Sequence, residues 1–447
     1  MTVRPDLDAL RAAGFSAVRA AQIAATIPRL DAALHGAHAA TPTLTFVVPG
    51  RIEVFGKHTD YCGGESLLCA VDRGFTVRVA PRPDHLVRVL DLGRAWDTIV
   101  ALEPSAAAPP GSWGNYVATV ARRLSTNFPT ARTGCDIAFE SDLPSAAGLS
   151  SSSALIVACA KAIIAVNAIH RTAEWSTAIG TIEEEAAYLG TVENGADFGA
   201  LAGVTGVGTF GGSEDHAAIL SARPAALVRL GFAPVRRLGV LSVPSDHVFV
   251  VGVSGVVADK TGSARVRYNA VSARARELVA LWNSAQGTDH ASLAAVLTAA
   301  PGAEERLHTY IETDVCDAVR RAALHDRLTH FTREWRTHIP AAAAALAAGD
   351  LSAFGVAASA SHHDGGALLG NGVAQTDTLQ RLAMEQGAAA ASAFGAGFGG
   401  SVWALVSRTY ATAFAKRWLD AYRAAHPERA TRAATFLTEA GPALQQW

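Results

Sequence analysis

The sequence LPSAAGLSSSSAL at residues 143–155 carries the strongest information about the fold. It places a glycine and four consecutive serines, Ser150–Ser153, before an apolar run at 154–169 that is long enough for a buried helix. Backbone N–H groups at the start of a helix, together with serine hydroxyls, can hold the oxygens of a phosphate group. The stretch therefore predicts a phosphate-binding loop that opens a helix. Simple N-capping by serine is the alternative interpretation.

Two more glycine-rich stretches lie at residues 50–64 and 395–400. The first contains a Gly-Lys pair, but its spacing is one residue too long for a P-loop, and His58 stands where Ser or Thr would bind magnesium. The second reads GAGFGG and fits the pattern GxGxxG. We expect a helix before it, around 379–393, and a strand after it at 402–406, which reverses the order of a dinucleotide-binding fold. Both a P-loop and a Rossmann site are therefore excluded.

The remaining segments mix helical and strand patterns. Residues 5–40 are alanine-rich with helical spacing of apolar residues and predict a pair of helices. Short β-branched runs at 44–48 and 76–80 predict strands. The alanine run at 341–348 predicts a packed helix.

Size and composition narrow the class of protein. A chain of 447 residues exceeds what one core usually serves, and we expect two domains, at 1–240 and 241–447, with a ligand cleft between them. The net charge of −2, with basic residues spread out, excludes a nucleic-acid partner. The five cysteines form no CxxC pair, which argues against zinc and disulfides. With no long apolar stretch we expect no membrane association, a cytoplasmic protein and a small-molecule partner.

Taken in order, the three glycine-rich stretches resemble the motifs of the GHMP kinases and, within them, the galactokinases. PGRIEVFGKHTDYCGG at 49–64 is similar to the galactokinase signature PGRVNLIGEHTDYNGG. Residues 143–155 resemble the phosphate loop LPxGAGLSSSAxL, and residues 394–401 resemble GAGFGGC. The resemblance covers most of the chain.

This resemblance implies a two-domain α+β fold, with an N-terminal domain related to ribosomal protein S5 domain 2 and a ferredoxin-like C-terminal domain. It implies that ATP, magnesium and a sugar meet between the two domains. The expected activity is an ATP-dependent phosphorylation of a free sugar at its anomeric hydroxyl. We expect the chain to be a monomer or a weak oligomer.

Phosphoryl transfer needs a group that orients the attacking hydroxyl and a cation that stabilises charge. The segment GGSEDH at 211–216 is similar to the galactokinase segment CGIMDQ, and this similarity makes Asp215 the predicted base. Asp197 is the alternative, because residues 191–210 look like an insertion relative to that pattern. Arg51 matches the arginine of the signature and is the predicted catalytic cation.

The resemblance also implies which residues bind the nucleotide and which bind magnesium. Glu185 resembles the glutamate of a family segment, AExxxVG, and with Ser151 it is a predicted magnesium ligand; a solvated helix face is the alternative interpretation. The predicted cofactor-binding residues are Gly148, Leu149, Ser150, Ser151, Ser152, Ser153 and Trp113.

Sugar recognition is where the sequence departs from the family. His58 and Asp60 keep the signature, and Gly212 and Tyr268 match further substrate-binding positions, but the signature's glutamate has become Lys57. A lysine there could pair with a carboxylate, which suggests a uronic-acid 1-kinase as one alternative function.

Two other interpretations stay open at this point. The family's asparagine has also changed, to Glu53, and an ion pair between Glu53 and Lys57 would neutralise both changes without altering the substrate. A non-catalytic, galactokinase-like sugar sensor is the remaining alternative. Retention of Asp215 and Arg51 argues against it, since a sensor needs no proton acceptor.

Overall fold

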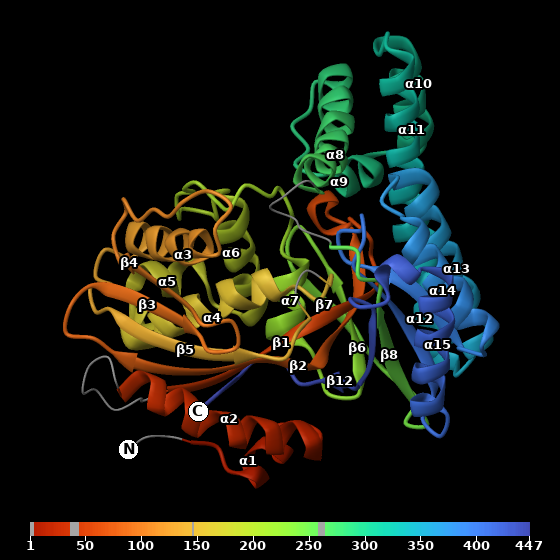
Figure 1. Cartoon of the computed structure of the whole chain (residues 1–447). Helices are drawn as coiled ribbons and strands as arrows, with labels where there is room; N and C mark the ends of the chain where they lie inside the picture. Colours follow the sequence, from red (N-terminus) through yellow and green to blue (C-terminus); the bar gives the residue numbers. More distant parts are fainter. Residues whose placement is uncertain (1–3, 36–43, 145–146, 258–263) are drawn as a thin grey trace.

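The structure is a computed structural model that describes residues 4–35, 44–144, 147–257 and 264–447 (Figure 1). Within these residues, two sheets and their covering helices make up a mixed α and β architecture. No helix in the described part of the chain is long and apolar enough to cross a membrane.

The larger sheet holds nine of the described strands in the order β13-β1-β2-β5-β3-β4, with β12 and β6 paired to β2 and β7 paired to β6. All of its pairings are antiparallel except that of β3 with β5. Its strands are β1 (Leu44–Phe55), β2 (Glu65–Pro81), β3 (Leu86–Asp91), β4 (Trp96–Ala101), β5 (Cys135–Ser141), β6 (Ala226–Gly231), β7 (Arg236–Ser242), β12 (Ala440–Gly441) and β13 (Gln445–Gln446).

Helices cover both faces of this sheet. The predicted N-terminal pair is confirmed as α1 (Leu7–Ala12) and α2 (Ala17–His35), which lie against one face (Figure 1). The opposite face carries α3 (Gly114–Asn127), α4 (Ser151–Val166), α5 (Ala173–Ala178), α6 (Ile182–Asn194) and α7 (Glu214–Ser221). Because β1 is covered on both sides, it is buried almost throughout, including the charged residues Arg51 and Glu53.

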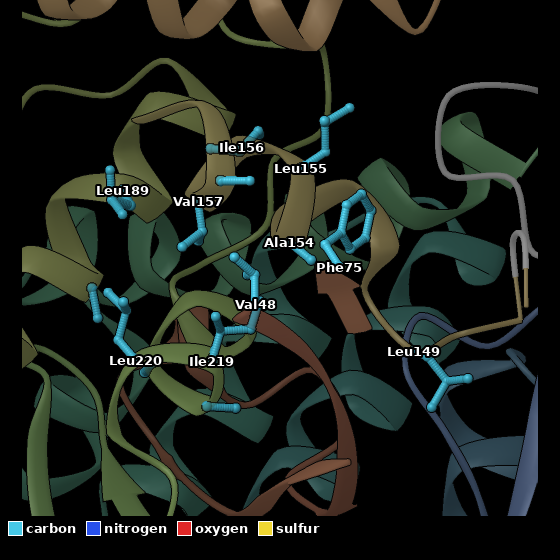
Figure 2. Packing of buried hydrophobic residues seen from close by; sticks show 14 of the residues in the cluster. Val48, Phe75, Leu149, Ala154, Leu155, Ile156, Val157, Leu189, Ile219 and Leu220 are labelled. Atoms are coloured by element: carbon cyan, nitrogen blue, oxygen red, sulfur yellow. The ribbon is translucent and has the colours of Figure 1, made fainter. Parts of the chain in front are cut away.

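The serine-rich stretch does open a buried helix, α4. Ala154, Leu155, Ile156 and Val157 belong to the same buried cluster as Val48 of β1, Phe75 and Ile219 (Figure 2). Leu149 anchors the loop before the helix in the same core cluster. The apolar run therefore fixes the position of the serine-rich N-terminus above β1.

The smaller sheet is antiparallel, in the order β11-β8-β10-β9. Its strands are β8 (His247–Val253), β9 (Ala390–Phe394), β10 (Ser401–Ser407) and β11 (Ala434–Thr438), and its helices include α12 (Ile339–Ala348), α13 (Leu351–Asp364), α14 (Ala374–Glu385) and α15 (Ala411–Ala425). This β-α-β-β-α-β succession is ferredoxin-like. Between β8 and α12, four helices project away from both sheets (Figure 1): α8 (Ala264–Gln286), α9 (Leu293–Ala299), α10 (Ala303–Asp314) and α11 (Ala318–Arg333).

The structure differs from the sequence-based prediction in the segment before the GxGxxG stretch. The predicted helix at 379–393 ends at Glu385, because Gly387 adopts a positive φ of 90° and residues 390–394 form β9 inside the sheet. The expected helix is confirmed up to Glu385, but its extension to 393 was wrong, and the GxGxxG stretch joins two antiparallel strands. The predicted domain boundary at 240/241 falls within β7, and the two-domain division stays a prediction.

Candidate active site

An ion pair between Arg51 and Asp215 forms the centre of a polar pocket where β1, α7 and the β9–β10 loop meet. Arg51 donates to Oδ1 of Asp215 from Nη2 at 2.6 Å and from Nε at 2.8 Å. Its Nη1 donates to the carbonyl of Gly148 in the phosphate loop. The Arg51 side chain is 2% exposed and that of Asp215 is 13% exposed. The predicted base and cation are therefore in contact, with the carboxylate open to the pocket.

Local structure explains how this arginine stays charged inside the protein. Burial alone would lower the pKa of Arg51, but the nearby carboxylates of Asp215, Glu214 and Glu53 raise it above its usual value. Arg51 lies on β1 beside a register shift, and its N–H donates to the Leu149 carbonyl at 3.2 Å. The strand therefore fixes both the guanidinium and the loop that follows β5.

The phosphate loop runs directly into α4. Gly148 has a φ of 80° and Ser150 a φ of 59°, so the chain turns sharply just before the helix begins. The third motif supports the loop from the C-terminal side, since Ser401 Oγ donates to the Ala147 carbonyl at 2.7 Å. Residues 145 and 146 of the motif lie outside the described residues. Ser153, in the first turn of α4, donates from Oγ to Asp215 Oδ2 at 3.2 Å, so the start of this helix lies beside Asp215.

The carboxylate of Glu193, which was not predicted from the sequence, also lies beside Ser153. Ser153 Oγ lies 2.8 Å from Glu193 Oε2, and Glu193 lines the pocket at the C-terminal end of α6. The predicted metal ligand Glu185 instead accepts from Lys161 Nζ at 2.7 Å. It is not among the residues lining the described pocket. The geometry thus favours Glu193 over Glu185 as the carboxylate beside Asp215.

Next to the start of α4, a cavity of about 170 Å³ is lined by aromatic residues and by Ser151 and Ser152. The rings of Trp96 and the predicted Trp113 stack at 5.7 Å with an interplanar angle of 22°. Trp96 comes from the start of β4, and no sequence pattern marks it. A cavity with aromatic walls beside the serine-rich helix start suits a nucleotide base.

Four predicted sugar-binding residues line the pocket on the other side of Asp215: His58, Asp60, Gly212 and Tyr268. His58 Nε2 lies 3.1 Å from the Ala396 carbonyl, which only accepts, so in the neutral ring Nδ1 accepts from the Tyr61 hydroxyl at 2.7 Å.

Gly212 lies so close to Asp60 that a larger residue would not fit. A Cβ on this residue would lie 2.5 Å from Asp60 Oδ2, so only glycine allows the close approach. The segment before Asp215 therefore packs directly against the loop that carries Asp60.

Lys57 behaves differently from the other predicted sugar-binding residues. It is 3% exposed and is not among the residues lining the described pocket. Its ammonium donates to Ser361 Oγ at 2.9 Å, and Ser361 donates to Glu334 Oε1 at 3.0 Å. Lys57 thus belongs to a buried network behind the pocket wall. It attracts Glu53 electrostatically, but its described hydrogen bond goes to Ser361.

The alternative base, Asp197, lies in the inserted segment and accepts from the Gly203 N–H at 2.6 Å, away from Arg51. The insertion packs against α3, where Arg123 donates to the Ala196 carbonyl and Asn127 to the Ala202 carbonyl. It therefore braces the end of α6, which carries Glu193, and the geometry favours Asp215 over Asp197.

Comparisons with known proteins agree with this geometry. The sequence matches the family profiles described as the galactokinase galactose-binding signature at 34–81, the GHMP kinases N terminal domain at 115–201 and the GHMP kinases C terminal at 342–424. A galactokinase of Chloroflexus aurantiacus is 30% identical over 383 residues, covering 85% of this chain and 88% of that protein. This chain belongs to the galactokinase family. It is therefore a sugar kinase, a phosphotransferase of the GHMP kinase group.

Other galactokinase-family relatives show the same extent of similarity. The galactokinase of Chloroflexus aggregans is 28% identical, again over 85% of this chain and 88% of its own. Among solved structures, Lactococcus lactis galactokinase complexed with galactose matches 94% of this chain and 99% of its own with a TM-score of 0.73 and 23% identity. L. major mevalonate kinase matches 90% of this chain and 99% of its own with a TM-score of 0.53 and 15% identity. These structural likenesses establish the shared α+β fold.

Proposed function

We propose that this galactokinase-family enzyme transfers the terminal phosphoryl group of ATP to the anomeric hydroxyl of a neutral, galactose-like sugar. The observation that carries the proposal is the buried Arg51–Asp215 pair, which lies between a phosphate-binding helix start and a pocket of hydrogen-bonding side chains. The relatives with this fold and signature are named galactokinases, which supports galactose as the first substrate to test.

Asp215 is the group that acts on the sugar hydroxyl. Its carboxylate keeps one oxygen on Arg51 and the other near Ser153, so that it can accept a hydrogen bond from the attacking hydroxyl and take up its proton. Arg51 keeps that carboxylate in place and, through the Gly148 carbonyl, ties it to the phosphate loop. A permanent cation there also offsets the charge that develops on the phosphoryl group in transfer.

ATP and magnesium fit the residues around the start of α4. The Ser150 hydroxyl is buried and has no hydrogen-bond partner among the described residues, as expected for a donor reserved for an anion. Ser151 and the carboxylate of Glu193 provide the hard oxygen atoms that Mg²⁺ prefers. Magnesium held by these oxygens would neutralise part of the charge on the phosphate groups. We expect the base to lie in the cavity that Trp96 and Trp113 line.

A neutral sugar is favoured over a uronic acid for an electrostatic reason. The ammonium of Lys57 is engaged with Ser361 behind the wall, and the guanidinium of Arg51 is held by Asp215. The carboxylates of Asp60 and Glu193 also line the pocket and would repel a carboxylate ligand. The described contacts thus leave the carboxylate-binding hypothesis without a cation.

The test is ATP consumption by the purified protein with magnesium against galactose, glucose, arabinose, galacturonate and glucuronate. We expect turnover with galactose or a related neutral sugar and none with the two uronates. The Lys57→Met variant should keep the same order of preference, because the ammonium lies behind the wall. Turnover restricted to a uronate, and lost in Lys57→Met, would overturn the proposed substrate class.

A further inference from the structure

The turn at residues 56–64 connects the pocket to the helical arm formed by α8–α11 (Figure 1). On one side, His58, Asp60 and Tyr61 of this turn line the pocket that holds Asp215. On the other side, Cys62 belongs to the buried apolar cluster of the arm, and Tyr61 packs against that cluster. The arm therefore supports the wall of the pocket from behind.

Three buried side chains on one face of a single helix contact this turn. They are Arg327 and Phe331 of α11 and Glu334, the first residue of the π-helical turn η3 (Glu334–His338) that continues α11. Successive spacings of four and three residues place them on the same side of the helix. Phe331 approaches so closely that a Cβ on Gly64 would lie 2.7 Å from its ring carbon Cε2. The helix is thus pressed directly against the turn.

Arg327 and Glu334 hold the backbone at the two ends of the sharpest part of the turn. Glu334 Oε1 accepts the Gly56 N–H at 2.8 Å and the Lys57 N–H at 3.4 Å. Arg327 Nη2 donates to the His58 carbonyl at 2.6 Å. His58 has a φ of 56°, a conformation that is unfavourable for a residue other than glycine and persists only where its surroundings fix it. The two helix side chains supply these fixing contacts.

Arg327 also contacts the side chain that orients the ring of His58. Its Cζ atom lies 5.7 Å from the centre of the Tyr61 ring, within the range of a cation–π interaction. The hydroxyl of Tyr61 bonds to Nδ1 of His58 at 2.7 Å, and Nε2 of the same ring bonds to the Ala396 carbonyl. Loss of Arg327 would therefore loosen both the backbone and the ring of His58.

We propose that the face of α11 and η3 that carries Arg327 and Glu334 is a positioning element, which holds His58 and Asp60 in the geometry that binds the sugar. Neither helix residue is among the described residues that line the pocket, so each acts through the turn. The assignment of the sugar as the ligand of this wall rests on the proposed function.

The nucleotide side of the site has separate supports. The phosphate loop is held by Arg51, through the Gly148 carbonyl, and by Ser401, through the Ala147 carbonyl. None of these contacts involves the helix face described above. A change in Arg327 should therefore affect the sugar without affecting ATP.

Steady-state kinetics should show this separation. Arg327→Met removes the donors but keeps an unbranched side chain, and we expect the KM for the sugar to rise about tenfold, with kcat within about threefold and the KM for ATP unchanged. Glu334→Ala should act in the same direction, because the Gly56 N–H loses its acceptor. Arg320→Met is the matched control, since Arg320 is exposed on the same helix and pairs with Glu277. An unchanged sugar KM, or an equal rise in both KM values, would overturn the positioning role.

Hydrogen–deuterium exchange tests the contact even if no sugar is turned over. In folded Arg327→Met, the N–H groups of residues 56–64 should exchange at least about tenfold faster than in the wild type, while α4 is unchanged. If that variant does not fold, Arg327→Lys carries the same test, because it keeps a cation but loses the forked contact. Unchanged exchange of residues 56–64 in a folded variant would overturn the proposal. Faster exchange there, in a protein whose wild type turns over no neutral sugar, would overturn only the proposed substrate.

Discussion

Replacing Arg51 by methionine removes the cation at the centre of the pocket while keeping an unbranched apolar side chain. The wild-type guanidinium makes two hydrogen bonds to Asp215 and one to the Gly148 carbonyl, and its side chain is 2% exposed. Removing one partner of a buried ion pair typically costs about 3–5 kcal/mol. Because Asp215 is 13% exposed and water can reach it, we expect the lower end, about 3 kcal/mol of the free energy of unfolding.

The effect on catalysis should be at least as large. If the same interaction holds the base in place during transfer, a loss of about 3 kcal/mol corresponds to a fall of more than about a hundredfold in kcat. Urea unfolding and steady-state kinetics with the preferred sugar measure the two effects separately. Arg51→Lys should be intermediate, since it keeps the charge but loses the two-pronged contact. Arg381→Met, at an exposed surface pair, should change neither quantity by much. A kcat of Arg51→Met within about threefold of the wild type would refute the argument.

Three further predictions concern the residues around this centre. Trp113→Ala should raise the KM for ATP about fivefold and leave that for the sugar unchanged, as titrations of each substrate will show, because it removes one face of the stacked cavity. Glu193→Gln should raise the magnesium concentration needed for half-maximal activity, whereas Glu185→Gln should not; the opposite order would restore Glu185 as the ligand. Gly212→Ala should raise the KM for the sugar, because the added Cβ would displace Asp60; an unchanged KM would contradict that contact.

The parts of the site that sequence could predict are those encoded in contiguous motifs. Arg51, the serine-rich loop and Asp215 lie in short segments whose spacing is fixed by a strand or a helix start, so each could be placed without knowledge of the rest of the fold. Glu193 was missed because the resemblance to the family segment AExxxVG pointed to Glu185, and because Glu193 lies within residues 191–210, which look like an insertion. The packing of α6 against α4 brings Glu193 to Ser153.

The remaining differences come from tertiary context. Lys57 lies in a motif that lines the pocket, yet its long side chain turns away to Ser361, whose position depends on α13. Trp96 comes from a hairpin strand with no distinctive pattern. The alanine-rich stretch at 390–394 has high helix propensity, but sheet pairing with β10 overrides it.

The most direct test of the account is the Asp215→Asn variant, assayed by ³¹P NMR for the formation of sugar 1-phosphate from ATP and the preferred sugar. The change removes the proton acceptor but keeps the shape of the side chain, and ATP binding can be checked by calorimetry. We predict that sugar 1-phosphate formation falls by at least about a thousandfold while the affinity for ATP changes little. Sugar 1-phosphate formation at close to the wild-type rate would contradict the assignment of Asp215 as the base.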